Sequence, residues 1–438
     1  MSASEPNRHA APCLRRSMGK SNMFTVFAFL GLFFCSLVAF PQSFVVTNVR
    51  VFDGEVVYPS TDVTVRNGRI TAVGSSLTTN DVPYIDGAGA TLLPGLIDAH
   101  THTEQVGQLE ESLRFGVTTV LDMGTFPPYE VPLREAAATR VDIADFRSAG
   151  ILATAPGGHG TEYGIEIPTV AGPEEAVDFV RQRSQEGVDF LKIVMNGVRA
   201  ARTGMPTLGE GTVRALVSSG HEAGLMVLAH VESQDDVRLA ISAGVDGLVH
   251  HWRDSGAQPE LAELLASNNV FVMPTLTAID GLLGLGQQAL LQDERVVPYL
   301  SDLAQRELTK ELPTRSLGVN YRKNANQAMV SLIEEGVQLL AGSDASTGNT
   351  GIVHGASLHR LLELFVGVGL SPIETLRTAT SNVAEAFSLS DRGRIQPGLR
   401  ADLVLVRGDP TVDITATRDI IRVWRGGVEL SRREFGGH

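Results

Sequence analysis

Two histidines separated by one residue are the first candidates for chemistry in this sequence. The stretch Pro-Gly-Leu-Ile-Asp-Ala-His-Thr-His spans residues 94–102 and ends in His100 and His102. Alternate side chains of an extended strand point the same way, so both imidazoles would project from one face. Two neutral imidazoles on one face are half of a divalent-metal site. Because such pairs also occur as ordinary half-buried strand residues, the metal hypothesis requires further ligands.

Strands that alternate with helical patterns fill the middle of the chain, about residues 93–390. We count eight strand candidates, at 95–102, 117–123, 150–155, 189–195, 225–230, 246–251, 270–276 and 337–344. Helical stretches such as PEEAVDFVRQRSQEG lie between them and end near a glycine that can cap a helix. Eight strand-then-helix units predict an α/β fold, a (β/α)8 TIM-like barrel; a doubly wound open sheet would not need eight units. The charged segment 280–326 is interpreted as an insertion after strand seven.

The two ends of the chain differ from this middle. Alternating Val, Thr and Ile residues interrupted by Asn67-Gly68 are typical of hairpins, and LVLVRGD and IIRVWRGGVEL repeat the pattern near the C-terminus. Residues 43–92 and 391–438 are therefore expected to form one small β-sandwich domain from both termini. The barrel domain would occupy residues 93–390.

The predicted barrel brings the missing ligands to the histidine pair. Active-site residues of such barrels lie at the carboxyl ends of the strands. Candidate residues lie on or at the ends of strands one, four, five, six and eight: His100 and His102, Lys192, His230, His250, and Asp344. Their convergence on one rim turns a weak motif into a strong metal-site prediction.

The motifs resemble those of the amidohydrolase superfamily, in particular its imidazolonepropionase-like and prolidase-like branch. The resemblance covers nearly everything after residue 43. It rests on PGLIDAHTH, FLKIVMNG, LAHVES, GVDGLVHH, LAGSDAS and the closing TSNVAEAF…GRIQPGLRADLVLV. It implies two divalent metal ions, with zinc expected and manganese, iron or nickel as alternatives. The ligand sets that it implies are His100, His102 and Asp344 for one ion, His230 and His250 for the other, and Lys192 between them.

The resemblance also implies a chemical role for each ligand. An N-carboxylated Lys192 would supply the bridging anion, and a water between two metals is acidic enough to be hydroxide near neutral pH. Asp344 would accept the proton of the attacking water and pass it to the leaving nitrogen, as general base and then general acid. The expected reaction is hydrolysis of an amide.

Simpler interpretations compete at three of these positions. Asp344, within Gly-Ser-Asp, could be a turn residue, although its place at the end of strand eight argues against this. Lys192 could be a strand-end lysine that pairs with Asp189 or Glu186. His250 and His251 are adjacent, so only one can point inward; motif alignment places the ligand at His250. His251 would then face the substrate or pack beneath the loop.

Four further residues are candidates for substrate binding. His159 lies between glycines in the loop after strand three, and the family-like segment suggests that it contacts the substrate carbonyl or carboxylate, with Tyr163 as a companion. His251 and His354 complete the set. His221 and His359 are interpreted as solvated or packing residues.

The N-terminal residues 1–42 have the pattern of a signal peptide or an anchor. Arg15, Arg16 and Lys20 precede eighteen uncharged residues at 23–40, MFTVFAFLGLFFCSLVAF. Export with cleavage is favoured, to the periplasm or outside the cell, and an uncleaved membrane anchor is the alternative. Both cysteines fall in this segment, so a mature protein would hold no disulfide.

Composition limits the classes of partner. The net charge of −14, sparse aromatic residues and the absence of a basic run in the body of the chain argue against a nucleic acid. A small-molecule amide or a short peptide is the expected substrate. A membrane would be contacted only through an uncleaved leader, and a homo-oligomer stays open.

The sequence therefore predicts a metal-dependent amidohydrolase acting on an N-acyl amino acid or dipeptide-type substrate. A lactonase, esterase, phosphotriesterase or cyclic-amide hydrolase could use the same ligands. A catalytically silent scaffold is disfavoured because all six ligand positions are filled.

Overall fold

The computed structural model describes residues 42–77, 81–285, 287–310, 320–348 and 350–432. The leader expected at 1–42, with both cysteines, lies outside these residues except for its last position. Within the described ranges, no helix is long and apolar enough to cross a membrane.

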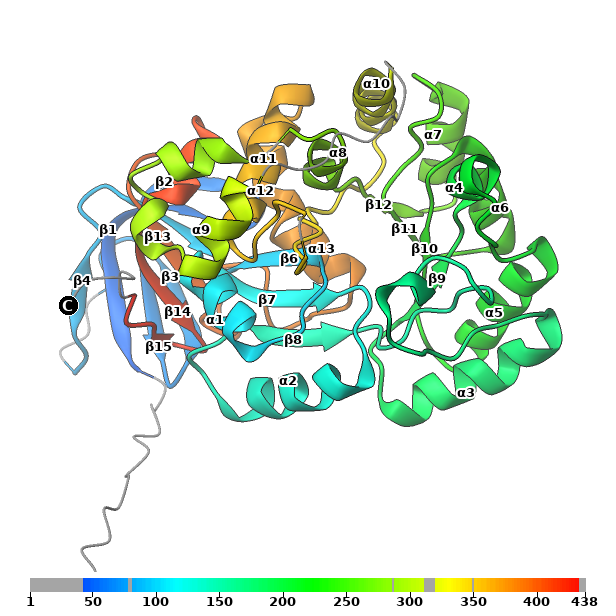
Figure 1. The fold of residues 1–438 in the computed structure, drawn as a ribbon. Coiled ribbons are helices and arrows are strands. Elements are labelled where there is room, and N and C mark those ends of the chain that lie inside the picture. Colours follow the sequence, from blue (N-terminus) through cyan, green and yellow to red (C-terminus); the bar gives the residue numbers. More distant parts are fainter. Residues whose placement is uncertain (1–41, 78–80, 286, 311–319, 349, 433–438) are drawn as a thin grey trace, which may run out of the picture. The chain divides into compact units, whose positions relative to one another are not determined.

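Strands from both ends of the chain pair in one eight-stranded sheet (Figure 1). Its order is β15-β14-β13-β5-β1-β2-β3, and β4 pairs with β1 beside this path. The N-terminal β5 is antiparallel to the C-terminal β13, so the two ends of the sequence meet inside the sheet. The strands are β1 (Phe44–Phe52), β2 (Val57–Arg66), β3 (Arg69–Gly74), β4 (Tyr84–Asp86), β5 (Thr91–Pro94), β13 (Leu403–Val406), β14 (Ile420–Arg425) and β15 (Val428–Glu429).

Strand β13 is buried on both faces. Leu403 and Leu405 pack with Trp424 in a cluster of this sheet, whereas Val404 and Val406 belong to the main core. This explains why the strand is a continuous apolar run and not an alternating one. The described strands of these two segments form one paired sheet, so their pairing alone does not show a two-sheet sandwich.

The central strands form two parallel sheets. The first has the order β6-β7-β8 and the second β12-β11-β10-β9. Their bounds are β6 (Leu96–Thr101), β7 (Val117–Asp122), β8 (Asp145–Ser148), β9 (Leu191–Val194), β10 (Val227–His230), β11 (Gly247–Val249) and β12 (Phe271–Met273).

Isolated β-bridges connect the edge strands of these two sheets to other segments of the same chain. The segment expected to form strand eight, 337–344, makes no regular strand but takes part in this bridging. The isolated parallel bridges are Ala153–Ile193, Val272–Leu339 and Thr101–Ala345. Regular pairing therefore does not by itself show a closed eight-stranded barrel.

Strand three lies earlier than the sequence predicted. The structure has β8 at Asp145–Ser148, and the expected strand 150–155 contributes only the bridge at Ala153. Gly150 ends the strand because its φ of +59° is left-handed. A Cβ at this glycine would lie 2.8 Å from Val188 Cγ1, so the close packing also requires glycine.

Most helices follow a central strand, and α3, α5, α6 and α7 lie along the β9–β12 sheet in Figure 1. The helices are α1 (Val106–Arg114), α2 (Pro127–Thr139), α3 (Ala176–Glu186), α4 (Gly197–Thr203), α5 (Glu210–Glu222), α6 (Gln234–Ala243), α7 (Pro259–Ser267), α8 (Leu276–Leu282), α9 (Asp302–Thr309), α10 (Tyr321–Glu334), α11 (Ala356–Val368), α12 (Pro372–Thr378) and α13 (Ser381–Ala386). Between α8 and α10, the described part of the expected insertion packs its own apolar cluster against Phe115.

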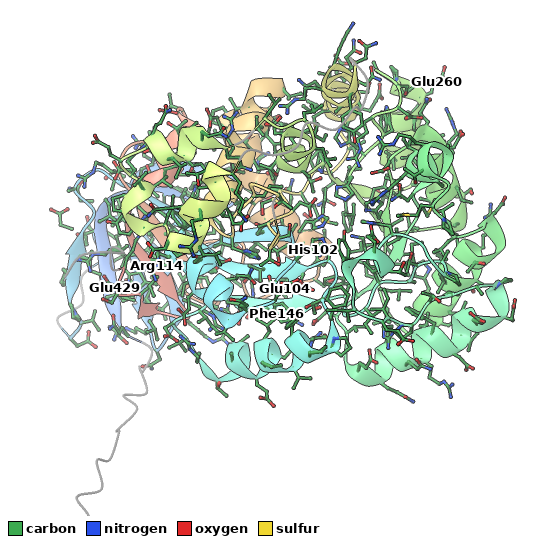
Figure 2. All side chains as sticks on the ribbon, in the orientation of Figure 1. His102, Glu104, Arg114, Phe146, Glu260 and Glu429 are labelled. Atoms are coloured by element: carbon green, nitrogen blue, oxygen red, sulfur yellow. The ribbon has the colours of Figure 1, made fainter. Side chains whose placement is uncertain are left out.

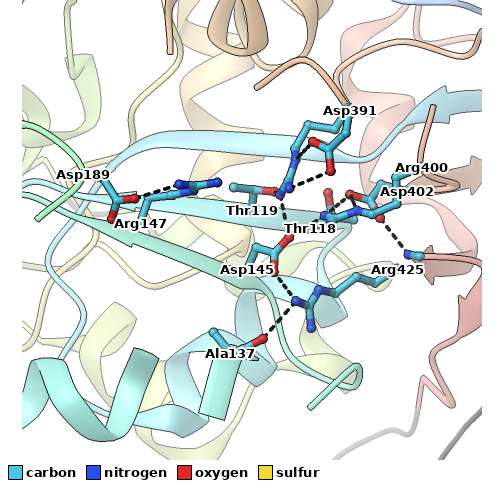
Figure 3. A network of polar contacts seen from close by, with 12 residues as sticks. Thr118, Thr119, Ala137, Asp145, Arg147, Asp189, Asp391, Arg400, Asp402 and Arg425 are labelled. Atoms are coloured by element: carbon cyan, nitrogen blue, oxygen red, sulfur yellow. Dashed lines mark hydrogen bonds and ion pairs between the residues drawn. The ribbon is translucent and has the colours of Figure 1, made fainter. Parts of the chain in front are cut away.

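A buried ion cluster ties the start of β8 to the C-terminal segment (Figure 3). Asp145 contacts Arg392 Nη1 and Arg400 Nη2, each at 2.5 Å, and also pairs with Arg425. Burial alone would raise the pKa of Asp145, but the three arginines lower it to about 2. The central strands and the terminal sheet are thus joined by charge as well as by apolar packing.

Candidate metal centre and active site

Three potential ligand atoms meet at the ends of β6 and of the 337–344 segment. His100 Nε2 lies 3.2 Å from His102 Nε2 and 3.2 Å from Asp344 Oδ1, and His102 Nε2 lies 3.4 Å from the same oxygen. All three atoms lie within 4.8 Å of one another, which fits a single metal ion. Two imidazoles and a carboxylate are a ligand set that zinc and similar divalent ions accept.

His230, His250 and Lys192 lie against this group. The rings of His230 and His250 are 4.5 Å apart, and that of His250 is 5.2 Å from the ring of His100. Nε2 of His230 is buried and has no hydrogen-bond partner among the described residues. An unpartnered buried imidazole nitrogen fits a ligand position better than a packing role. The structure thus brings all six predicted ligands together.

Left-handed backbone positions orient two of these ligands. His250 has a φ of +68° and Asp344 a φ of +59°, and Thr275 at the end of β12 has a φ of +38°. Such conformations cost on the order of 1–3 kcal/mol in residues other than glycine and concentrate at functional sites. Thr275 Oγ1 lies 2.5 Å from His250 Nδ1, which leaves Nε2 of His250 for a ligand.

The electrostatics of the histidines favour metal binding. Burial lowers the pKa of His100, His230 and His250 well below the ordinary value, so these rings are neutral, as metal ligands must be. Burial opposes the positive charge of His102 too, but its bond with Asp344 raises the pKa of that ring. Burial alone would raise the pKa of Asp344, but the neighbouring His100, His102 and Lys192 lower it to about 2.

Lys192 does not pair with Asp189 or Glu186, which was the simpler interpretation of this lysine. Asp189 accepts a hydrogen bond from Arg134 at 2.9 Å, and Glu186 pairs with Arg183. Burial lowers the pKa of Lys192 to about 8, although nearby carboxylates oppose the shift. A larger share of neutral amine at physiological pH is what carbamate formation requires.

Two predicted substrate contacts face a pocket of about 1190 Å³ that the metal-ligand candidates also line. His159 Nδ1 lies 2.7 Å from Glu162 Oε1, and Arg199 Nη1 lies 2.9 Å from the same nitrogen. The His159 ring is 5.3 Å from that of His230, so its Nε2 is the nitrogen left for a substrate. Tyr163, 60% exposed, packs edge-on against His159.

The other two predicted substrate contacts do not line this pocket. His251 is fully buried, and its Nε2 lies 3.1 Å from the carbonyl oxygen of Ala325 in α10. His354 is also buried, with Nε2 3.3 Å from Thr103 Oγ1. The left-handed turn at His250 sends the next side chain beneath the loop, so packing, not substrate contact, describes His251.

Several residues of the site were missed in the sequence. Asp98, inside the histidine motif, is fully buried and accepts hydrogen bonds from Ser343 Oγ at 2.6 Å and Ser343 N at 2.9 Å. Asp122 at the end of β7 accepts from Thr103 N at 2.8 Å. Asp122 could have been identified from the sequence, because it is a carboxylate near the end of a predicted strand. Both residues brace the loops that carry ligands.

The strand ends face one side of the central sheets. Figure 2 shows His102 and Glu104 beyond the end of β6, whereas Arg114 lies toward the opposite end, beside the terminal sheet. Glu104 Oε2 lies 2.5 Å from Thr347 Oγ1, which ties the loop after β6 to the loop after Asp344. Both glutamate and threonine line the pocket.

Comparison with known proteins places this site in a family context. The model of the amidohydrolase family matches residues 91–430. An adenine deaminase of Lysinibacillus sphaericus is 24% identical over 89% of this chain, which spans 57% of that protein. The chain thus spans little more than half the length of the adenine deaminases that it matches. An imidazolonepropionase of Cereibacter sphaeroides is 27% identical over 84% of this chain and 94% of its own length.

Solved structures agree in fold. A Xaa-Pro dipeptidase with bound methionine is 22% identical, covers 89% of this chain and 99% of its own, and superposes with a TM-score of 0.73. A putative prolidase from Bifidobacterium longum is 27% identical, with coverages of 90% and 96% and a TM-score of 0.72. The chain has a TIM-barrel-type fold with an additional domain, and it belongs to the amidohydrolase family.

Proposed function

We propose that this protein is a metal-dependent hydrolase that cleaves a carbon–nitrogen bond in a small amide, of the N-acyl amino acid or dipeptide type. The observation that carries the proposal is the approach of His100 Nε2, His102 Nε2 and Asp344 Oδ1 to within 4.8 Å of one another at the pocket. The names of the relatives support the bond type, since adenine deaminases, imidazolonepropionases and prolidases all act on such bonds.

The six candidate ligands divide between two ions, most readily zinc. His100, His102 and Asp344 would hold one ion, His230 and His250 the other, and Lys192 would join them. Divalent ions held there would polarise a substrate carbonyl and make a water more acidic. The Lys192 amine would combine with carbon dioxide, losing one proton, to give a carbamate with the geometry of a carboxylate.

Asp344 is the proposed catalytic acid–base residue. Its pKa of about 2 leaves it deprotonated at neutral pH, so it can accept a proton from the attacking water. The same carboxyl group then returns that proton to the leaving nitrogen. His159, fixed through Nδ1, would hold the substrate carbonyl or carboxylate with Nε2, and Tyr163 lies beside it at the pocket mouth.

A substrate panel tests the proposal. Protein loaded with zinc, manganese, iron or nickel is assayed against N-acyl amino acids, dipeptides, lactones and phosphotriesters. Turnover of the amides, lost in Asp344→Asn, supports the proposal, and turnover of esters alone would replace it with a lactonase or esterase. Protein that binds no divalent metal would contradict hydrolase function altogether and favour a scaffold.

The full architecture is part of the proposal. Phe44 of β1 and Trp424 of β14 stack at 5.1 Å although two strands lie between theirs in the sheet, which supports a sheet that folds back as a sandwich. The bridges at the sheet edges support closure of the central strands as a (β/α)8 barrel. Residues 43–92 joined to 391–438, and residues 93–390, expressed as separate proteins and compared by circular dichroism, would test these domain limits.

Export is the proposed route for this protein. The basic residues followed by the apolar run at 23–40 support it. Sequencing of the N-terminus of secreted or periplasmic material tests it, since an uncleaved leader would indicate a membrane anchor.

A further inference from the structure

Arg253 is a buried cation in the pocket wall that the proposed hydrolysis does not use. It follows the candidate ligand His250 by three residues and is only 3% exposed. Its Nη2 donates to Glu232 Oε1 at 2.6 Å, and its backbone N donates to the Glu232 carbonyl at 3.1 Å. The Tyr321 ring lies 5.5 Å from the guanidinium carbon. These contacts hold the guanidinium in one place.

The guanidinium is incompletely satisfied. Nε and Nη1 of Arg253 are buried and have no hydrogen-bond partner among the described residues. Arginine carries five N–H donors and no acceptor, and unmet donors in a buried site are unfavourable. A ligand that accepts hydrogen bonds and carries negative charge would remove this deficit.

An unsatisfied arginine alone does not make a site, as Arg183 in α3 demonstrates. Arg183 is 1% exposed, pairs with Glu186 and packs its guanidinium 4.9 Å from the Phe179 ring, and its Nη1 is also unpartnered. It does not line the pocket. The position of Arg253 among pocket residues, in the same strand-end loop as a candidate metal ligand, is what distinguishes the two.

Charged side chains of both signs line the pocket around Arg253. Its positive charge reaches the metal-ligand candidates, since it contributes to lowering the pKa of His230 and His250. Arg199 and Arg202 line the same pocket. The pocket carboxylate of Glu162 is already bound by Arg199 at 3.1 Å. Glu232 and Asp254 line the pocket as well, so Arg253 is distinguished by its two unpartnered donor nitrogens and not by an excess of positive charge.

We propose that Arg253 binds a carboxylate of the substrate and so selects amides that carry one, such as N-acyl amino acids and dipeptides, over neutral amides. This inference rests on the proposed function, and it assigns to Arg253 substrate specificity, not chemistry. Glu232 and Tyr321 act as positioning residues, because each contacts the guanidinium.

A matched substrate pair tests the proposal. The metal-loaded protein is assayed with N-acetyl-L-phenylalanine and with its C-terminal carboxamide. Both contain the same amide bond between the acetyl group and the α-nitrogen, and release of acetate is measured. We expect kcat/KM to favour the carboxylate by roughly 10- to 100-fold. In Arg253→Met this ratio falls to near one, and in Arg253→Lys it is intermediate because lysine keeps the charge but not the planar fork. Arg183→Met, the matched control, keeps the wild-type ratio.

Two results would overturn the inference: a wild-type ratio near one, or an unchanged ratio in Arg253→Met. If neither substrate is hydrolysed, calorimetric binding of the same two compounds measures the preference, and the loss of turnover across all amides of the panel is what contradicts the proposed function. Should Arg253→Met fail to fold, Arg253→Lys takes its place. A kcat/KM ratio of the two substrates that equals the wild-type ratio in Arg253→Lys contradicts the proposed contact.

Discussion

Thr275 Oγ1 lies 2.5 Å from His250 Nδ1, and both residues have a positive φ. The hydroxyl fixes the ring so that the opposite nitrogen, Nε2, is available to a metal. Partners of this kind on the second nitrogen orient metal-binding histidines and strengthen binding. The pair joins the ends of β11 and β12.

Removing this hydroxyl should weaken metal binding. Thr275→Val keeps the volume but loses the hydrogen bond, and we expect metal affinity to fall roughly 10- to 100-fold. Competition titration with a chelating dye measures it, and Thr275→Ser is the control that keeps the hydroxyl. Wild-type affinity in Thr275→Val would show that His250 is not a ligand oriented in this way.

Carboxylation of Lys192 gives a direct spectroscopic prediction. Metal-loaded protein equilibrated with ¹³C-bicarbonate should show a carbamate resonance that is absent from Lys192→Met. Since the pKa of Lys192 is lowered to about 8, the neutral amine that reacts with carbon dioxide is available at neutral pH. A wild-type spectrum without this resonance, from active protein, would rule out a carbamate bridge.

Glu162 should affect catalysis without affecting the metal. Burial would raise the pKa of Glu162, but its bond with His159 lowers it to about 2, so the carboxylate holds the ring at neutral pH. Glu162→Gln weakens this contact, and we expect kcat/KM to fall about tenfold with unchanged metal content. Glu166→Gln, an exposed residue nearby, serves as control. Loss of metal in Glu162→Gln would point to a structural role instead.

The ion cluster of Asp145 predicts acid sensitivity. The folded-state pKa of about 2 lies below the ordinary 3.8, so the carboxylate stabilises the fold above pH 4 and loses this contribution as pH falls toward 2. Asp145→Asn leaves Arg425 without its carboxylate partner, while Arg392 and Arg400 keep Asp391 and Asp402, and should cost about 3–5 kcal/mol at pH 7.

Urea unfolding at pH 7, 4 and 3 measures the free energy of unfolding of both proteins. The difference between Asp145→Asn and wild type should be smallest at pH 3. Asp142→Asn is the control, because Asp142 is 59% exposed and its bond with Arg140 is a surface ion pair. A difference in unfolding free energy that does not depend on pH would mean that lost packing, and not lost charge, explains the lower stability.

Local patterns made the metal group predictable. The alternation of a strand places His100 and His102 on one side, and the strand-end rule placed Lys192, His230 and Asp344 beside them. The six ligand candidates do meet in the structure. Their roles as metal ligands stay predictions.

Features that depend on a single backbone angle or on distant loops were beyond the sequence patterns. The left-handed turn at His250 decides that His251 packs on α10, and the φ of Gly150 decides where β8 ends. The contacts of Arg253 with Glu232 and Tyr321 join three separate segments, so no local spacing indicates them. The terminal strands were recognised as one domain built from both ends, but the order in which they pair was not.

The position of β5 inside the terminal sheet has a consequence for biosynthesis. One edge of β5 pairs with β1, which precedes it, and the other with β13, which the ribosome delivers only after the whole central region. During translation this edge therefore stays open, and the arginines that neutralise Asp145 are equally late. Open strand edges invite pairing with other chains. In a nascent chain, this edge of β5 therefore stays accessible to other chains until residues 403–406 emerge.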